Sequence, residues 1–475
     1  MNNHSYKADW RIWFLTFFHV LITLGLFFIF WRVFRYGSLF GSNTDNTERY
    51  DFYVVILYGV LFTFFKHTYN AYLFGYTRIR ELVFKQFISQ LFSVCIVYMI
   101  VALAWNKLLN PICFAEMLLC CIICDVVCSI LGNRMYYESN PPKHSIILYR
   151  NDRDLKRLHG LTGKPMENLY LFDKQLCTAG RDFISIRSEL EPYDVIFAAG
   201  IDSAVRNGIM KYCAQTGKSI IFLPHIGDVL VKGSEHIPAF SSPVLAFSKK
   251  KLSIEYAFTK RAFDIFAAAL GIVIFSPVMA VTALLIKTYD KGPALYKQTR
   301  LTQNGSEFKI LKFRSMREDA EKDGKARLST GEHDDRITPI GRVIRKCRLD
   351  ELPQLFNIFV GDMSIVGPRP ERPEIAKEYC EQLPEFSLRL QVKAGLTGYA
   401  QVFGKYNTEP YEKLEFDLLY INSMSVLTDL KLMFATVGIL FSKESTEGIG
   451  VGQVTAMNFE GSVERTENRA KIVGK

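Results

Sequence analysis

Long apolar stretches dominate residues 1–132 of this 475-residue chain and decide what that part can fold into. A helix of about 20 apolar residues, rising about 1.5 Å per residue, spans the hydrocarbon core of a bilayer. The first stretch is too long for a cleavable signal peptide, and no small-residue cleavage site follows it. The sequence therefore predicts four membrane helices, of which the second has the weakest signal: 13–34, 52–65, 86–105 and 111–132.

Basic residues in the connecting loops set the expected orientation of these helices. Lys66, Arg78 and Lys85 lie between the second and third stretches, and Arg134 follows the fourth. Since loops rich in Lys and Arg stay in the cytoplasm, we expect the N-terminus and the chain after residue 139 on that side. We therefore expect a multi-pass membrane protein with its soluble parts on the cytoplasmic side.

The net charge of +10 favours anionic lipid head groups and phosphorylated substrates. No interleaved basic and aromatic pattern indicates nucleic acid, so we expect no such partner. Four cysteines lie within nine residues without a nearby histidine, and we interpret them as small side chains packing between membrane helices rather than as a metal site: Cys120, Cys121, Cys124 and Cys128. No cysteine pattern indicates an oxidising compartment.

The segment 140–250 has the pattern of an α/β module. Short apolar runs at 145–149, 194–199 and 219–223 predict strands, and helical stretches lie between them. Such alternation is typical of a small parallel sheet with flanking helices. No Gly-x-Gly turn follows the first strand, so a structural or regulatory role is favoured over dinucleotide binding.

A second apolar run, 262–286, is also long enough to cross a membrane. Ser276 and Pro277 interrupt it near its middle, and a proline removes a helical hydrogen bond and bends the helix. Basic residues flank both ends, whereas a crossing segment usually shows charge asymmetry. We therefore predict a re-entrant helix that enters one leaflet and returns; a kinked full span is the alternative.

An acidic pair, Asp350 and Glu351, follows a stretch rich in Lys and Arg. Taken alone, such a pair near a helix start is more often a cap that the helix dipole favours. Inside a cationic surround, two carboxylates also suit a site that holds a divalent metal and a phosphate together. The strings around the pair favour the second interpretation, and they are Lys312-Phe-Arg-Ser-Met316, Leu349-Asp-Glu-Leu-Pro-Gln-Leu355 and Val366-Gly-Pro-Arg-Pro370.

In this order and spacing, these strings resemble the bacterial polyprenyl-phosphate sugar-phosphate transferases, in particular their large monotopic members. The resemblance covers essentially the whole chain and is most specific over 260–437. It implies a membrane helical bundle, a Rossmann-like α/β module and an α-rich transferase domain with a re-entrant helix. The corresponding segments are 1–139, 140–250, 251–442 with the re-entrant helix at 262–286, and a loose tail at 443–475.

The resemblance also implies a reaction and its residues. A sugar-1-phosphate passes from a UDP-sugar to undecaprenyl phosphate with release of UMP, as the first membrane step of exopolysaccharide, capsule or O-antigen synthesis. Asp350 is then the nucleophile that forms a covalent phosphosugar intermediate and a ligand of Mg²⁺, and Glu351 assists by activating the lipid phosphate. Ser276 and Pro277 mark the re-entrant break, and phosphate contacts fall to Lys312, Arg345 and Arg369.

The chemistry of the reaction agrees with these residue types. A carboxylate that attacks a diphosphate needs cations to neutralise the approaching anions, and the planar fork of Arg binds phosphate through two donors. For Asp264, an ion pair with Lys260 or Arg261 and a catalytic role are equally favoured. Asp417 and Asp429 are expected in surface ion pairs, and Tyr399 and Gln401 near the nucleotide. A non-catalytic membrane scaffold and a glycosyltransferase that moves the sugar alone remain alternatives. A homodimer and contact with membrane lipids are also expected.

Overall fold

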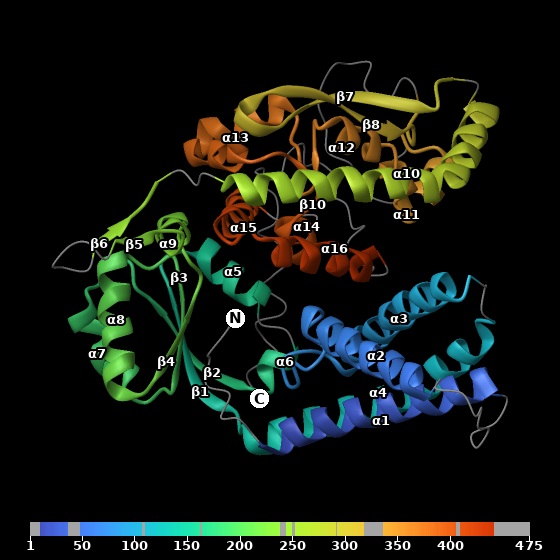
Figure 1. Cartoon of the computed structure of the whole chain (residues 1–475). Coiled ribbons are helices and arrows are strands. Elements are labelled where there is room, and N and C mark those ends of the chain that lie inside the picture. Colours follow the sequence, from blue (N-terminus) through green and yellow to red (C-terminus); the bar gives the residue numbers. More distant parts are fainter. Residues whose placement is uncertain are drawn as a thin grey trace. The chain divides into compact units, whose positions relative to one another are not determined.

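The computed structural model describes residues 10–36, 48–106, 110–161, 164–237, 244–248, 252–290, 292–317, 336–404 and 409–440. The predicted tail 443–475 lies outside these residues. The chain divides into two compact units, Met1–Pro224 and His225–Lys475. Figure 1 shows the helices and strands of both units.

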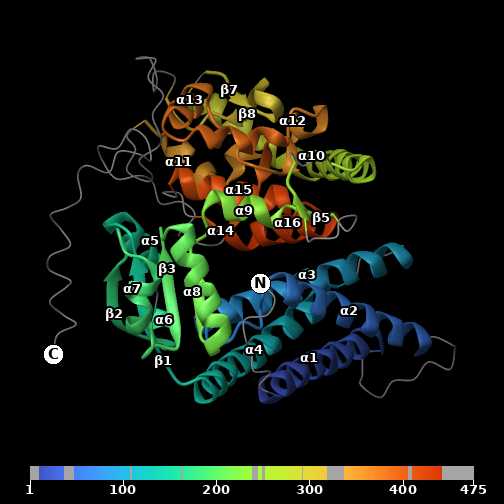
Figure 2. The same cartoon turned by 90° about the vertical axis from the view of Figure 1, so that its left-hand side faces the viewer.

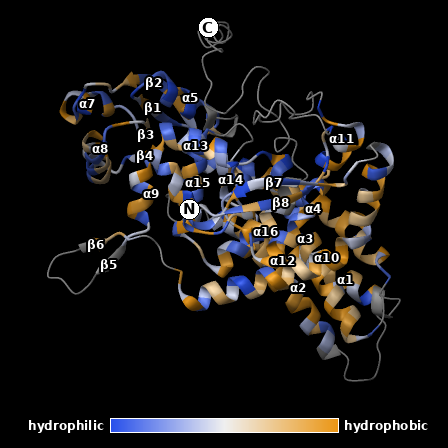
Figure 3. Ribbon diagram, turned by 90° about the horizontal axis from the view of Figure 1, so that it is seen from above, coloured by the Kyte–Doolittle hydropathy of each residue, from blue (hydrophilic) through white to orange (hydrophobic). Residues whose placement is uncertain are grey.

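The first unit begins with four helices, α1 (Trp10–Tyr36), α2 (Glu48–Thr68), α3 (Ile79–Ala104) and α4 (Ile112–Ser139). Each contains one of the four predicted apolar stretches or most of it. By length and composition α1, α3 and α4 could cross a membrane, whereas α2 does not meet that criterion. Large apolar side chains are exposed along α1, among them Phe14, Phe18 and Ile22. Figure 3 shows hydrophobic residues along all four helices, as expected for a lipid-facing surface.

A parallel sheet follows, with strand order β2-β1-β3-β4. Its strands are β1 (Lys143–Tyr149), β2 (Tyr170–Cys177), β3 (Val195–Ala199) and β4 (Ser219–Phe222). The helices between them are α5 (Asp152–Leu161), α6 (Lys164–Glu167), α7 (Phe183–Leu190) and α8 (Ser203–Thr216). The predicted parallel sheet is therefore confirmed.

Alternate side chains of β1 enter two different cores. Ile146 and Leu148 pack with α7 and α8, and Ile147 packs with α5 on the other face. Successive side chains of a strand point to opposite faces, so a strand buried on both sides reads as a continuous apolar run. Figure 2 shows this arrangement of a sheet with helices on both faces.

The second unit begins with α9 (Ile226–Lys232), the hairpin strands β5 (Glu235–Ile237) and β6 (Val244–Ala246), and the long helix α10 (Ile254–Asp290). An antiparallel pair follows, β7 (Leu295–Leu301) and β8 (Glu307–Phe313), joined at η1 (Gln303–Gly305). The remaining elements are α11 (Pro339–Lys346), η3 (Leu349–Glu351), α12 (Gln354–Val360), β9 (Ser364–Val366), α13 (Pro373–Gln382), η4 (Pro384–Gln391), β10 (Gly395–Thr397), α14 (Tyr399–Phe403), α15 (Pro410–Asn422) and α16 (Val426–Leu440).

Helix α10 contains the second apolar run and is the fourth helix long and apolar enough to cross a membrane. Pro277 lies inside it, the helical assignment continues through the proline, and Figure 1 shows that the helix bends. The Ser276 hydroxyl donates to the Val273 carbonyl at 2.8 Å. Val273 lies four residues before Pro277, which has no amide hydrogen to donate to that carbonyl. The predicted break is thus a bend in one continuous helix.

The two halves of α10 pack into different cores of the second unit. Ala268 is buried in the main core with Ile358 of α12. Met279 and Ile286, beyond the proline, pack with Phe313 of β8 and Ile344 of α11. The bend lets one helix contact the elements on both sides of the acidic pair.

Candidate active site

Asp350 and Glu351 lie in the 3₁₀ turn η3, between α11 and α12. Thr338 caps α11 by accepting a hydrogen bond from the Gly341 amide at 2.9 Å, and Pro339 occupies the first turn. Arg348, immediately before the turn, has φ of 55°, a conformation that costs energy in a residue with a Cβ. Leu349 and Leu352 pack beside the C-terminal half of α10 and hold the turn in place.

The Glu351 carboxylate is bound by two cations. Its Oε1 accepts from Lys312 Nζ at 3.2 Å and from the Arg369 guanidinium at 3.0 Å. Burial alone would raise the pKa of Glu351, but the charges of Lys312 and Arg369 outweigh it and hold the pKa far below its usual range. Burial lowers the pKa of Lys312, against the opposing charge of Glu351. Glu351 is therefore ionised at neutral pH.

Asp350 has the opposite environment. Its Oδ1 is buried and accepts no hydrogen bond from the part of the chain that the structure describes. Burial and the neighbouring charge of Glu351 raise the pKa of Asp350, while the charges of Lys312, Arg345 and Arg348 oppose the rise. An ionised Asp350 thus has an oxygen to which no described residue donates, and a nucleophile needs such an oxygen.

The loop that carries Arg369 is fixed by backbone packing around Gly367. The Gly367 amide donates to Thr397 at 2.8 Å, and the Gly395 amide donates to Pro368 at 2.9 Å. A Cβ on Gly395 would lie 2.0 Å from the Gly367 nitrogen, and a Cβ on Gly398 would lie 2.2 Å from the Gly367 oxygen. Only glycine at these positions allows the segments 366–370 and 395–398 to approach each other so closely.

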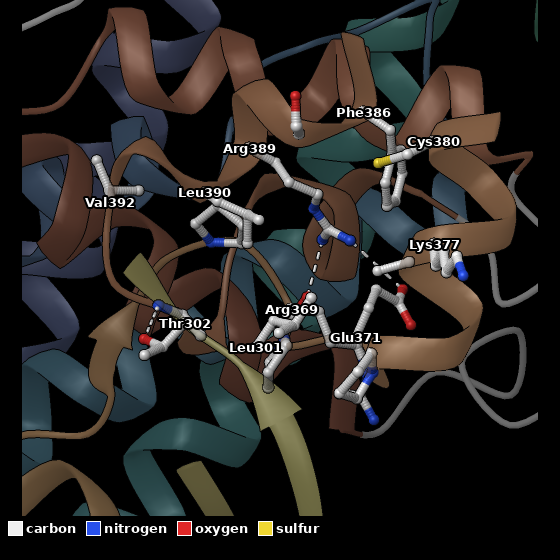
Figure 4. Close-up of a pocket in the computed structure, with 16 residues that line it drawn as sticks. Leu301, Thr302, Arg369, Glu371, Lys377, Cys380, Phe386, Arg389, Leu390 and Val392 are labelled. Carbon is white, nitrogen blue, oxygen red and sulfur yellow. Dashed lines mark hydrogen bonds and ion pairs between the residues drawn. The ribbon is translucent and has the colours of Figure 1, made fainter. Parts of the chain in front are cut away.

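Behind Arg369 lies a buried network that our sequence predictions did not include. Arg389 donates to the Arg369 carbonyl at 2.8 Å and pairs with Asp417 at 2.8 Å and with Glu371 at 3.5 Å. Figure 4 shows the Arg389 guanidinium pointing toward Arg369 and Glu371 at the wall of a pocket of about 280 Å³. Apolar side chains form most of the remaining wall, including Leu301, Phe386 and Leu390.

The N-terminal half of α10 is tied to the same unit by three residues. Arg261 donates to the carbonyls of Ile358 and Phe359 at the end of α12, at 2.7 and 2.8 Å. Asp264 accepts a hydrogen bond from the Ile365 amide at 3.0 Å. This contact is structural, but it is made with a backbone amide and not with the basic side chain of the predicted ion pair. Lys260 pairs with Asp429 at 2.7 Å.

Two sequence expectations about acidic residues were wrong about exposure. Asp417 and Asp429 were expected in surface ion pairs; both form ion pairs, but both are buried. Their partners, Arg389 and Lys260, are distant in sequence, so only the fold reveals the burial. Gln401 lies in α14, where its amide donates to the Leu396 carbonyl at 3.5 Å.

Comparison with known proteins places this arrangement in a family. Residues 255–443 match the family model described as bacterial sugar transferase. A UDP-glucose:undecaprenyl-phosphate glucose-1-phosphate transferase of Caulobacter vibrioides is 41% identical over 191 residues, 39% of this chain and 71% of that protein. The chain belongs to the bacterial sugar transferase family. The predicted resemblance is confirmed.

Two longer relatives match this chain over a smaller share of their own length. A UDP-N-acetylgalactosamine-undecaprenyl-phosphate N-acetylgalactosaminephosphotransferase of Aeromonas hydrophila is 41% identical over 185 residues, 38% of this chain and 43% of that protein. A UDP-glucose:undecaprenyl-phosphate glucose-1-phosphate transferase of Klebsiella pneumoniae is 35% identical over 239 residues, which are 49% of this chain and 51% of that protein. The matched part of this chain thus spans about half the length of these two relatives.

Within the bacterial sugar transferase segment, the structure brings the five predicted site residues into one place. Lys312 of β8 and Arg369 bind Glu351, and the charge of Arg345 on α11 acts on Asp350. No group of three or more His, Cys, Asp or Glu that could hold a metal occurs among the described residues. Mg²⁺ does not need such a cage, because it is usually held by one or two carboxylates with substrate phosphates and water. The open Oδ1 of Asp350 fits that pattern.

Proposed function

We propose that the chain transfers a sugar-1-phosphate from a UDP-sugar to undecaprenyl phosphate and releases UMP. The observation that carries the proposal is the contrast within the acidic pair: Glu351 is neutralised by Lys312 and Arg369, whereas Asp350 keeps a buried oxygen without a donor among the described residues. The names of the relatives from C. vibrioides and K. pneumoniae describe this reaction for UDP-glucose.

In the first step, an Asp350 carboxylate oxygen attacks the phosphorus atom that carries the sugar. The bond from that phosphorus to the bridging oxygen breaks, and UMP leaves with the electron pair. Lys312 and Arg369 reduce the repulsion between the attacking carboxylate and the diphosphate. A covalent phosphosugar is then attached to Asp350.

In the second step, an oxygen of undecaprenyl phosphate attacks the same phosphorus and Asp350 leaves as a carboxylate. The sequence prediction that Glu351 activates the lipid phosphate stays a prediction. Because its pKa lies far below the usual range, Glu351 is a weak proton acceptor. We infer that it acts mainly by orienting Lys312 and Arg369 toward the phosphates.

Asp350 would hold Mg²⁺ through one carboxylate oxygen while the other attacks, and the ion would neutralise charge on the diphosphate. The protein supplies the fixed cations, Lys312, Arg345 and Arg369, around the same position. Burial of the Asp350 Oδ1 atom limits its hydration.

We further propose that α10 is re-entrant and holds the site at the cytoplasmic face of the inner membrane. The residues around the bend are apolar and exposed: Val273, Ile274, Phe275 and Val278. On α12, next to α10, Phe356, Phe359 and Val360 are exposed as well. Lipid would cover these surfaces and bring Asp350 to the depth of the undecaprenyl phosphate head group. The sheet of the first unit is proposed as a Rossmann-like module.

A transfer assay in membranes tests the proposed reaction. Full-length protein is incubated with undecaprenyl phosphate and a panel of UDP-sugars labelled in the sugar, with Mg²⁺. We expect label in the lipid fraction and release of UMP for at least one donor. Release of UDP would instead indicate transfer of the sugar alone, and no transfer from any donor would favour the scaffold alternative.

A further inference from the structure

We propose that two arginines outside the predicted site, Arg389 and Arg300, are positioning residues that hold segment 367–371 so that Arg369 reaches Glu351. The inference rests on the proposed function for its kinetic consequence, but its geometry stands independently. Among the residues that the structure describes, neither arginine donates to Asp350 or Glu351 or pairs with them, so each would act through Arg369.

Arg389 holds the segment from inside the core. Its guanidinium donates to the Arg369 carbonyl at 2.8 Å and pairs with Glu371 at 3.5 Å, while the Arg389 side chain is only 3% exposed. The guanidinium also lies over the Phe386 ring, 4.8 Å from its centroid. A charged group in this position fixes the backbone of Arg369 and so limits where its 42%-exposed side chain can reach.

Arg300 holds the next residue of the same segment from β7. It donates to the Pro370 carbonyl at 3.0 Å and to the Gln298 side chain at 2.7 Å. The Leu301 amide donates to the Glu371 carbonyl at 3.0 Å. Three consecutive carbonyls, those of residues 369, 370 and 371, are therefore held by donors from outside the loop.

The charges around Arg389 explain why an arginine is needed. Asp417 and Glu371 face it, and Lys413 pairs with Glu371 at 3.6 Å. The planar fork of arginine serves the Asp417 carboxylate, the Glu371 carboxylate and the Arg369 carbonyl together. A lysine has one point charge and would reach only part of this set. Arg389→Lys therefore keeps the buried charge while it removes the clamp.

A double-mutant cycle separates positioning from general stability. Arg369→Ala, Arg389→Lys and the double variant are compared with wild type in the transfer assay. We expect Arg389→Lys to lower kcat/KM by about tenfold to a hundredfold, the range for hydrogen bonds to charged groups. If Arg389 acts through Arg369, adding Arg389→Lys to Arg369→Ala changes the rate by less than about threefold. Losses that multiply would overturn the proposal.

Arg206→Lys is the matched control, because Arg206 is also buried and lies 5.3 Å from the centroid of a phenylalanine ring, that of Phe222 in the first unit. We expect wild-type transfer from this variant. Wild-type kinetics in Arg389→Lys would overturn the proposal. If Arg389→Lys does not fold, Arg300→Lys tests the same clamp from the Pro370 side.

Hydrogen exchange gives a second readout that does not depend on activity. In the full-length protein, we expect the peptide covering residues 364–372 to exchange faster in Arg389→Lys than in wild type or Arg206→Lys. Unchanged exchange would count against the clamp, even if transfer is altered. Absence of transfer in wild type would refute the proposed function, while the exchange result would still decide the clamp.

Discussion

Asp350 and Glu351 are adjacent in one 3₁₀ turn, yet Oε1 of Glu351 lies 3.0 Å from Arg369 while Oδ1 of Asp350 has no donor among the described residues. Their pKa values are shifted in opposite directions, that of Asp350 upward and that of Glu351 downward. Pairs whose environments drive the pKa values apart commonly divide catalytic roles. The geometry thus distinguishes two side chains that spacing alone treats as equivalent.

Replacing the proposed nucleophile should abolish transfer. Asp350→Asn keeps the shape of the side chain but removes the attacking oxygen, so we expect turnover to fall by at least about a thousandfold. Single-turnover incubation with labelled UDP-sugar should also leave no label on the protein. Residual turnover above a tenth of wild type would exclude Asp350 as the nucleophile.

Neutralising Asp350 and neutralising Glu351 should have opposite effects on the stability of the protein. Burial disfavours the charged form of Asp350, so we expect Asp350→Asn to unfold at the same temperature as wild type or higher. Glu351→Gln leaves Lys312 buried without its counter-charge and should cost about 3 kcal/mol. Thermal unfolding of both variants in one detergent at pH 7 measures the contrast; equal shifts would contradict it.

Asp417 should give the stability a characteristic pH dependence. Burial raises the pKa of Asp417 from 3.8 to about 6, against the opposing charge of Arg389. The ionised group costs stability above pH 6, and this cost disappears as the pH falls toward 4. Relative to Asp417→Asn, wild type should therefore gain about 2–3 kcal/mol between pH 7 and pH 4. Unfolding midpoints of both proteins across this range provide the measurement, and a constant difference would show that Asp417 does not titrate there.

Two native cysteines test the topology of α10. Cys177 precedes the helix, Cys347 follows it, and both are exposed. If α10 is re-entrant, variants that retain only one of these cysteines should both react with an impermeant maleimide in inside-out vesicles and neither in spheroplasts. Labelling of Cys347 alone in spheroplasts would instead establish a full span.

A polar chain inside the first unit should hold its helices together. Lys66 of α2 lies 2.8 Å from His19 Nδ1, and His19 Nε2 lies 2.9 Å from Asp125, which also accepts from Gln90 of α3. Asp125→Leu leaves Lys66 without its buried counter-charge and should cost about 3 kcal/mol. Lys66→Met combined with Asp125→Leu should recover part of that loss. Unfolding by sodium dodecyl sulfate in lipid micelles compares wild type, Asp125→Leu and the double variant, and a double variant no more stable than Asp125→Leu would argue against coupling.

Local patterns predicted much of the fold. The apolar runs at 145–149, 194–199 and 219–223 form strands because they pair in a parallel sheet, where the first two are largely buried and the third is half-buried. Hydrophobicity alone was enough to predict them. Strand β2 was missed because it is an edge strand that carries Asp173, Lys174 and Gln175, most of it exposed. Its pairing with β1 depends on the fold and has no strong signal in its own sequence.

The candidate site was predicted through motifs and not through spacing. Lys312 and Glu351 are 39 residues apart, and no periodicity connects them. Arg389 and Asp417 were missed as partners because an isolated Arg or Asp is usually exposed, and only the tertiary structure shows that both are buried. The Ser276-Pro277 pair, by contrast, carried its own signal, since a proline bends any helix that contains it.

Helix α9 has a practical consequence for dissecting the protein. It lies before residue 251, where the predicted transferase segment begins, yet Ile226 and Val229 are buried in the core of the second unit. The Asn422 side chain of α15 donates to the Val229 carbonyl at 2.7 Å, and the Tyr411 hydroxyl accepts from the Ile226 amide at 3.3 Å. We expect a fragment cut at residue 251 to expose an apolar stripe on α15 and to aggregate, so a fragment intended to fold by itself should begin by residue 225.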